Sequence, residues 1–134
     1  MKMAIWEFEA IPQERIWGGR NLQERFGRTL PEGKKIGETW ELVDRAEAQS
    51  RVKQSGQTLG ELWSGLERKK LFGRRAPETE RFPILIKLLD AQDKLSLQVH
   101  PPADKARDLG GEPKTEMWFF LETQPGAEIF AGLR

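Results

Sequence analysis

The chain has 134 residues, with 22 Lys and Arg against 21 Asp and Glu, one His and no Cys. This length fits one domain of ordinary size, or part of one. The lack of Cys excludes a disulfide framework, thiolate metal ligands and a cysteine nucleophile. The single His excludes any metal site that needs two imidazoles from this chain, while a hydrophobic share of 37% allows a packed core.

The charges of the chain give no reason to expect a polyanionic partner. The formal net charge is +1, and basic residues are interleaved with acidic ones, as in Glu14-Arg15 and Glu67-Arg68. Nucleic-acid binding requires a concentrated basic surface, so we expect no nucleic-acid partner. The first ten residues lack the apolar core of a signal peptide, and no window approaches the ~20 apolar residues of a membrane span. We therefore expect a cytoplasmic protein without a membrane partner.

The N-terminal part predicts two short strands with a helix between them. Residues 3–9 and 36–43 combine β-branched and aromatic residues between turn signals, which is typical of strands. Between them, residues 15–27 predict a Gly-Gly turn that leads into a short helix.

A helix start is predicted at Thr58, because Glu61 follows three residues later in a capping-box pattern. Apolar residues at helical spacing extend this predicted helix to about Lys70, and Gly73 ends it. The charged, proline-containing residues 74–81 predict an exposed loop.

The C-terminal half predicts more strands than helices. Residues 83–89 predict a buried strand, and residues 94–100 an alternating one. A short helix over 103–109 and strands over 115–121 and 127–131 follow. Short strands joined by turns favour an antiparallel sandwich or a jelly-roll barrel, so the predicted fold class is mainly β with a few short helices.

One predicted strand carries polar residues that suit metal binding. Ser96, Gln98 and His100 alternate with apolar residues and share one face, about 6.6 Å apart for neighbours on that face. Two such side chains can converge on one ion. The alternative is a half-buried strand whose polar face meets water.

A second predicted strand offers a carboxylate. Lys114, Glu116, Trp118 and Phe120 share one face, so Glu116 becomes a third ligand if that face looks into the same cavity. A carboxylate, an imidazole and an amide oxygen suit zinc with an open coordination position. The alternative for Glu116 is a surface carboxylate paired with a neighbouring Lys.

Lys87 is the only charge in the apolar run PILIKLL of residues 83–89. Burying an ammonium without a partner is strongly unfavourable. A phosphate-type anion would satisfy Lys87, helped by the hydroxyl of Ser96. The alternative is an edge-strand lysine whose charged end reaches water.

Several motifs resemble those of type I mannose-6-phosphate isomerase (phosphomannose isomerase), a zinc enzyme of the cupin superfamily. They are IWGG at 16–19, GETWEL at 37–42, PILIKLLDAQDKLSLQVHP at 83–101, KTEMWFFLE at 114–122 and PGAEIFAG at 125–132. The resemblance implies a cupin-like jelly roll, and we expect residues 1–134 to form a single, partial domain with an incomplete barrel.

The resemblance also implies roles for the candidate residues. It implies that Gln98, His100 and Glu116 bind zinc, that Lys114 assists acid–base chemistry, and that Ser96 and Lys87 bind the sugar phosphate. The implied reaction interconverts mannose 6-phosphate and fructose 6-phosphate by a proton transfer between C1 and C2 of the opened sugar.

Family members are longer and supply another zinc His and a catalytic Arg from their later half. An incomplete barrel has an exposed strand edge, where we expect self-association. The alternative function is therefore a non-catalytic cupin-like module that binds a sugar phosphate or a partner chain. A purely structural protein, which would bind neither metal nor phosphosugar, is the third hypothesis.

Overall fold

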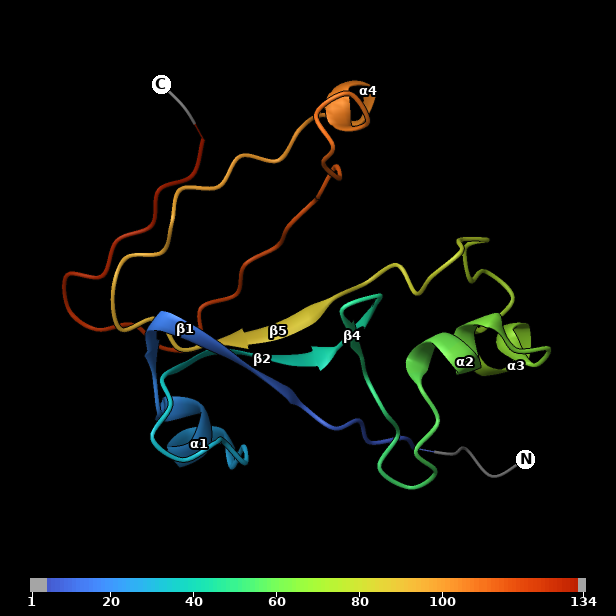
Figure 1. The fold of residues 1–134 in the computed structure, drawn as a ribbon, viewed down its shortest axis with the longest axis horizontal. Helices are drawn as coiled ribbons and strands as arrows, with labels where there is room; N and C mark the ends of the chain where they lie inside the picture. The colour runs from blue at the N-terminus through green and yellow to red at the C-terminus, as the bar shows by residue number, and fades with distance from the viewer. Residues whose placement is uncertain (1–4, 133–134) are drawn as a thin grey trace. The chain divides into compact units, whose positions relative to one another are not determined.

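A computed structural model of the chain describes residues 5–132 (Figure 1). The chain divides into two compact units, Met1–Leu95 and Ser96–Arg134. The elements in chain order are β1 (Ile11–Gly19), α1 (Asn21–Phe26), β2 (Ile36–Leu42), β3 (Asp44–Arg45), β4 (Ala48–Gln49), α2 (Leu59–Ser64), α3 (Arg68–Phe72), β5 (Ile86–Leu89) and α4 (Ala103–Ala106). Only α4 belongs to the second unit among these described elements.

The first unit is built on an antiparallel sheet in the order β1-β2-β5, with β3 and β4 forming a separate two-stranded pair. Figure 1 shows β1, β2 and β5 running side by side. The predicted strand over 36–43 is confirmed as β2, and the strand predicted over 83–89 occurs in a shorter form as β5. The prediction that this second strand is buried is wrong, since its residues are half-buried or exposed and β5 lies at the edge of the sheet. The strand predicted over 3–9 is not confirmed. Residues 3 and 4 lie outside the described residues, and among residues 5–9 the one β-type pairing is an isolated bridge from Phe8 to Val52.

The glycines of the IWGG motif lie in β1, so the predicted Gly-Gly turn is wrong. A Cβ atom on Gly18 would lie 2.3 Å from the backbone nitrogen of Gly37 on β2. Glycine at position 18 therefore allows β1 and β2 to approach closely. The pairing is irregular here, since Gly19 and Glu14 both pair with Ile36. The predicted short helix follows as α1.

The predicted helix from Thr58 to Lys70 begins as expected but is interrupted. Thr58 and Glu61 form the predicted capping box at the start of α2. Gly65 then has extended backbone angles, φ −69° and ψ 158°, which end α2 before α3 begins. The prediction of one continuous helix is wrong because Gly65 breaks it. Residues 74–81 are mostly exposed and lack regular structure, as predicted.

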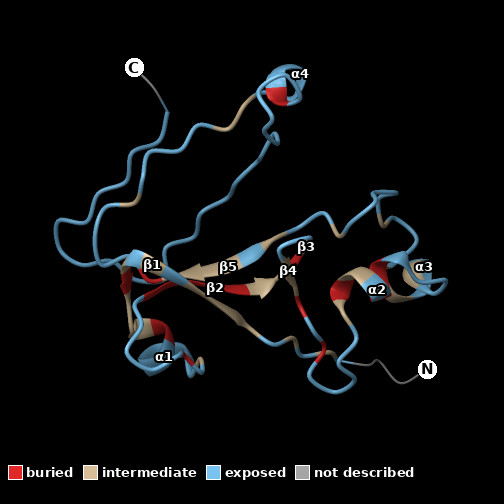
Figure 2. Cartoon of the chain, viewed as in Figure 1, coloured by how far each residue is buried: buried red, intermediate tan, exposed pale blue. Residues whose placement is uncertain are grey.

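The first unit contains two apolar groups among its buried and half-buried residues. Leu22, Leu30 and Ile36 form one cluster between α1 and the sheet, with Leu88 of β5 packed against it. Trp63 of α2 packs edge-on against Phe72 and Phe82, with ring centroids 5.1 and 5.2 Å away. Figure 2 shows buried residues on α1, β2 and α2.

The second unit contains α4 and long irregular segments. None of its described residues is assigned to a strand, so the strands predicted over 94–100, 115–121 and 127–131 are wrong as regular elements. Alternation of side chains is present in these sequences, but a strand also requires a hydrogen-bonded neighbour. The predicted helix over 103–109 is confirmed as the shorter α4, and the amide of Gly111 donates to the carbonyl of Ala106 at 2.8 Å.

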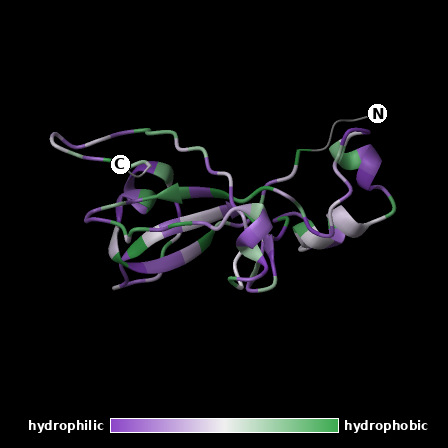
Figure 3. Cartoon of the chain, turned by 90° about the horizontal axis from the view of Figure 1, so that it is seen from above, coloured by the Kyte–Doolittle hydropathy of each residue, from purple (hydrophilic) through white to green (hydrophobic). Residues whose placement is uncertain are grey.

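The fold is mainly β with a few short helices, as predicted, and the described residues form no closed barrel. Hydrophobic and hydrophilic residues are interspersed along the chain (Figure 3). Within residues 5–132, no helix has the length and apolar character required to cross a membrane. The expectation of a single domain over 1–134 stays a prediction.

Candidate metal and substrate site

The second unit brings His100 and Glu116 together. The Nε2 atom of His100 lies 3.9 Å from Oε2 of Glu116, and their side chains are 31% and 36% exposed. This separation is too long for a hydrogen bond. Two ligand atoms that each lie about 2 Å from one ion are at most about 4 Å apart, so the pair is within reach of a shared metal.

The environment of His100 tests whether these residues fit a metal. Its Nε2 atom is buried and has no hydrogen-bond partner among the described residues. A buried polar atom without a partner is unfavourable, and a cation between Nε2 and the Glu116 carboxylate would satisfy it. Among residues 5–132 there is no group of three or more His, Cys, Asp or Glu side chains that could hold a metal. The third ligand that the sequence predicts, the amide of Gln98, is of another residue type.

Lys114 contacts the other oxygen of the same carboxylate. Its Nζ atom lies 2.8 Å from Oε1 of Glu116, and the Lys114 side chain is 35% exposed. This is the lysine pairing that the surface-carboxylate alternative expects for Glu116. The two oxygens of Glu116 thus face different groups, Oε1 an ammonium and Oε2 an imidazole.

Ser96 and Gln98 form a second contact in this unit. The Nε2 atom of Gln98 donates to Oγ of Ser96 over 3.4 Å, which is a long hydrogen bond. Both residues are exposed. The Gln98 amide oxygen takes no part in this contact and is the atom suited to a metal. The role of Gln98 as a metal ligand stays a prediction.

Lys87, in the first unit, has a protein partner that the sequence analysis missed. Its Nζ atom lies 3.3 Å from Oε2 of Glu38 on β2, and 5.0 Å from the ring centroid of Trp40. Lys87 and Trp40 are paired across β2 and β5, an arrangement that sequence alternation alone does not give. Lys87 lies on the edge strand β5, as the edge-strand alternative expects, but its side chain is only 23% exposed.

Glu38 has further partners on the same sheet. Its Oε2 atom accepts hydrogen bonds from Nη2 of Arg15 at 3.2 Å and from Nε1 of Trp40 at 2.7 Å. The Glu38 residue is buried, with 8% exposure. A signal for this cluster is present in the GETWEL motif, where an acidic residue lies inside an otherwise strand-like stretch.

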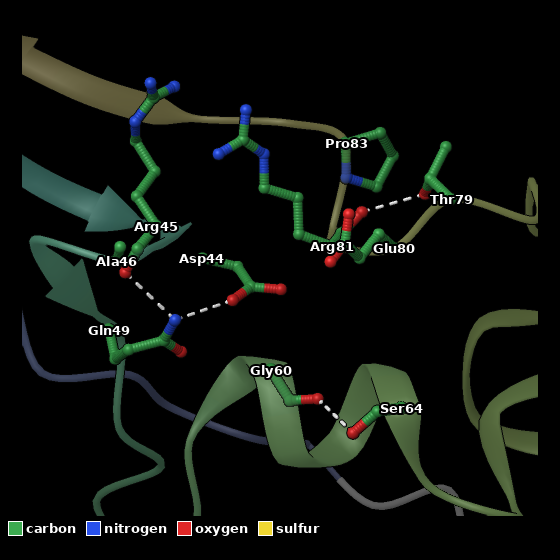
Figure 4. Close-up of a pocket in the computed structure, with 10 residues that line it drawn as sticks. All are labelled: Asp44, Arg45, Ala46, Gln49, Gly60, Ser64, Thr79, Glu80, Arg81 and Pro83. Atoms are coloured by element: carbon green, nitrogen blue, oxygen red, sulfur yellow. Dashed lines mark hydrogen bonds between the residues drawn. The ribbon is translucent and has the colours of Figure 1, made fainter.

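A cavity of about 670 Å³ in the first unit contains none of the predicted site residues. Figure 4 shows Asp44 and Gln49 beside Gly60 and Ser64 of α2. Asp44 accepts hydrogen bonds from Nε2 of Gln49 at 2.7 Å and from the amide of Phe82 at 2.7 Å. These contacts join the loop before β5 to the β3–β4 pair, so we assign the surroundings of this cavity a structural role.

Comparison with known proteins gives a consistent result. The chain matches the family "Phosphomannose isomerase type I, catalytic domain" over residues 5–119. It is 41% identical over 130 residues to the mannose-6-phosphate isomerase ManA of Bacillus subtilis, a match that covers 93% of this chain and 39% of ManA. It is 39% identical over 132 residues to the probable mannose-6-phosphate isomerase GmuF of the same organism, with 92% and 39% covered.

A solved structure agrees with these relatives. The crystal structure of the mannose 6-phosphate isomerase from Bacillus subtilis matches with a TM-score of 0.70 and 35% identity, covering 83% of this chain and 35% of that chain. The chain therefore spans about two fifths of the length of the curated relatives that it matches. The sequence and structure matches together show that the chain belongs to the type I phosphomannose isomerase family.

Proposed function

We propose that this chain supplies the zinc and sugar-phosphate sites of an aldose–ketose isomerase that interconverts mannose 6-phosphate and fructose 6-phosphate. Membership of the family is consistent with sugar-phosphate isomerisation. The observation that carries the proposal is the buried, unpartnered Nε2 atom of His100 beside the carboxylate of Glu116. In this proposal the protein is cytoplasmic, and it binds a sugar phosphate rather than a nucleic acid.

In this proposal Gln98, His100 and Glu116 hold zinc through an amide oxygen, an imidazole nitrogen and a carboxylate oxygen. This ligand set suits zinc and leaves a coordination position open. The chemistry that zinc supplies when bound is Lewis-acid polarisation of the sugar oxygens at C1 and C2.

Lys114 carries the proton in the proposed reaction. In the proposed step Lys114 takes the proton from C2 of the open-chain aldose, while the C–H electron pair forms a C1–C2 double bond and the C1 carbonyl pair moves onto the C1 oxygen. Lys114 then returns the proton to C1, while the C2 hydroxyl passes its proton to the C1 oxygen and its O–H electron pair forms the C2 carbonyl. Oε1 of Glu116, 2.8 Å from Nζ, stabilises the ammonium between these steps.

Ser96 and Lys87 bind the phosphate of the substrate in this proposal. An ammonium and a hydroxyl are both hydrogen-bond donors to phosphate oxygens. The long contact between Ser96 and Gln98 leaves the Ser96 hydroxyl hydrogen available to a ligand, since Ser96 acts there as acceptor.

The test is an assay of the purified chain with mannose 6-phosphate, first stripped of metal by a chelator and then supplied with zinc. We expect zinc-dependent formation of fructose 6-phosphate, lost in His100→Ala and Glu116→Gln. Glu128→Gln is the matched control, because Glu128 is an exposed carboxylate of the same unit outside the candidate site. Zinc content measured in parallel should fall in the first two variants and not in the control.

A second candidate function is a non-catalytic module that binds a sugar phosphate or a partner chain. The observation in its favour is that, among the described residues, no three His, Cys, Asp or Glu side chains lie together where they could hold a metal. Zinc and sugar-phosphate binding without turnover would support this module. A chain that binds no zinc at all would contradict the proposed metal site.

A further inference from the structure

The buried carboxylate of Glu38 is shared by two cations. Its Oε2 atom lies 3.2 Å from Nη2 of Arg15 and 3.3 Å from Nζ of Lys87, and it also accepts the indole N–H of Trp40. Arg15 comes from β1, Glu38 and Trp40 from β2, and Lys87 from β5. The cluster therefore joins all three strands of the sheet.

The charges within this cluster do not cancel. Two cations share one carboxylate, which leaves a net charge of +1. The other contact of Arg15 is to the uncharged backbone carbonyl of Glu14, and the Glu14 carboxylate pairs with Lys34 at 2.8 Å. Among the described residues, neither Arg15 nor Lys87 forms an ion pair with a carboxylate other than that of Glu38.

The exposure of the side chains favours an anion from outside. The Glu38 side chain is 10% exposed, whereas those of Arg15 and Lys87 are 35% and 23% exposed. An approaching anion thus reaches the two cations more readily than the carboxylate that holds them. The guanidinium fork of arginine matches phosphate geometry, and lysine adds a compact point charge.

We propose that Arg15 and Lys87 together bind one phosphate dianion, and that Glu38 is the positioning residue that holds the two cations at the spacing this requires. The identity of the ligand as a sugar phosphate rests on the proposed function. Arg15 is thereby a second phosphate-binding residue, from a strand far from Lys87 in the sequence, and Trp40 fixes the orientation of the carboxylate through its indole N–H.

The first test titrates the purified chain with mannose 6-phosphate, inorganic phosphate and mannose by calorimetry. We expect both phosphate compounds to bind, mannose 6-phosphate more tightly, and mannose alone not to bind at this site. Arg15→Gln and Lys87→Gln should each weaken phosphate binding by about tenfold, the size expected for a hydrogen bond to a charged group. Lys34→Gln is the matched control, because it removes one cation of the same unit from an exposed ion pair.

Glu38→Gln separates positioning from net charge. Removal of a negative charge would tighten phosphate binding if charge alone mattered, whereas loss of the spacing between Arg15 and Lys87 should weaken it. We expect weaker binding in Glu38→Gln and partial rescue in Glu38→Asp, with a circular dichroism spectrum and melting temperature measured for each. If neither Glu38 variant folds, the Arg15 and Lys87 variants, which leave the Trp40 contact to Glu38 in place, still decide the proposal.

The outcomes separate this inference from the proposed function. Phosphate affinity equal to the wild type in Arg15→Gln and Lys87→Gln would overturn the site, even in a chain that shows isomerase turnover. Tighter binding in Glu38→Gln would overturn the positioning role. Phosphate binding with the expected losses, in a chain without turnover, would support the anion site while contradicting the isomerase proposal.

Discussion

The carboxylate of Glu116 lies 3.9 Å from the unpartnered Nε2 atom of His100, and the ammonium of Lys114 lies 2.8 Å from its other oxygen. A metal ion bound by His100 and Glu116 would therefore share the Glu116 carboxylate with the Lys114 ammonium. Since like charges repel, the Lys114 ammonium opposes metal binding.

Replacement of Lys114 should consequently strengthen zinc binding. The Lys114–Glu116 pair is partly exposed, and such pairs contribute about 0.2–1 kcal/mol, so we expect Lys114→Met to bind zinc up to about fivefold more tightly. Competition with a zinc chelator measures the affinity. Lys105→Met, at an exposed lysine of α4, should leave it unchanged, and weaker zinc binding in Lys114→Met would contradict the proposed arrangement.

Asp90 caps helix α1 from outside the helix. Its carboxylate accepts the backbone N–H of Asn21 at 2.8 Å and the Asn21 side-chain amide at 3.0 Å, while the N-cap residue Arg20 makes no side-chain cap. Asp90 is buried, with 4% exposure, so Asp90→Ala should lower the free energy of unfolding by about 1–3 kcal/mol. Urea denaturation measures this loss. Exposed Asp93→Ala should stay close to wild type, and an equal loss in both variants would argue against a specific cap.

Gly18→Ala should destabilise the sheet. The added Cβ atom would lie 2.3 Å from the backbone nitrogen of Gly37, so β1 and β2 would have to separate. We expect a loss of about 1–3 kcal/mol in the free energy of unfolding, typical of overpacking. Gly27→Asn is the control, since Gly27 has φ 61°, a conformation that asparagine adopts, and open space around it. Equal stability of Gly18→Ala and wild type would show that the strands are not in close contact there.

The capping box of α2 makes part of the stability depend on pH. The Thr58 backbone N–H, assisted by the Thr58 side chain, lowers the pKa of Glu61 below its ordinary value. A lowered pKa in the folded state means that this stabilisation is present above the ordinary pKa of glutamate and is lost as the pH falls through the folded pKa. Acidification should therefore lower the melting temperature more in wild type than in Glu61→Gln. Exposed Glu32→Gln should follow wild type, and an identical acid response in Glu61→Gln would refute the assignment.

Local sequence signals predicted part of the fold well. The capping box at Thr58 and the strand over 36–43 depend on residues close in the sequence, and both occur. Gly18 and Gly19 look like a turn locally, but the approach of Gly37 across the sheet makes them strand residues. Strand alternation after residue 94 predicted ladders that require hydrogen-bonded neighbours, which those segments lack among the described residues.

For the candidate site, spacing in the sequence predicted one side-chain contact and missed another. The proximity of Lys114 and Glu116 follows from their spacing, and the structure places Glu116 beside His100. The partner of Lys87 was missed because Glu38 lies 49 residues away, and their contact depends on the pairing of β2 with β5. Residue spacing predicts which side chains share a face of a strand, but it does not predict which strands pair with each other.

The order of the strands has a consequence for synthesis of the chain. The central strand β2 pairs with β5, whose residues follow it by more than forty positions, so the sheet stays half-finished until β5 has left the ribosome. The segment around β5 also contains Lys87, which pairs with Glu38, and Asp90, which caps helix α1. In nascent chains that stall before residue 86, the carboxylate of Glu38 would lack its lysine partner and helix α1 would lack its cap. We expect chaperones to recognise such chains as unfolded.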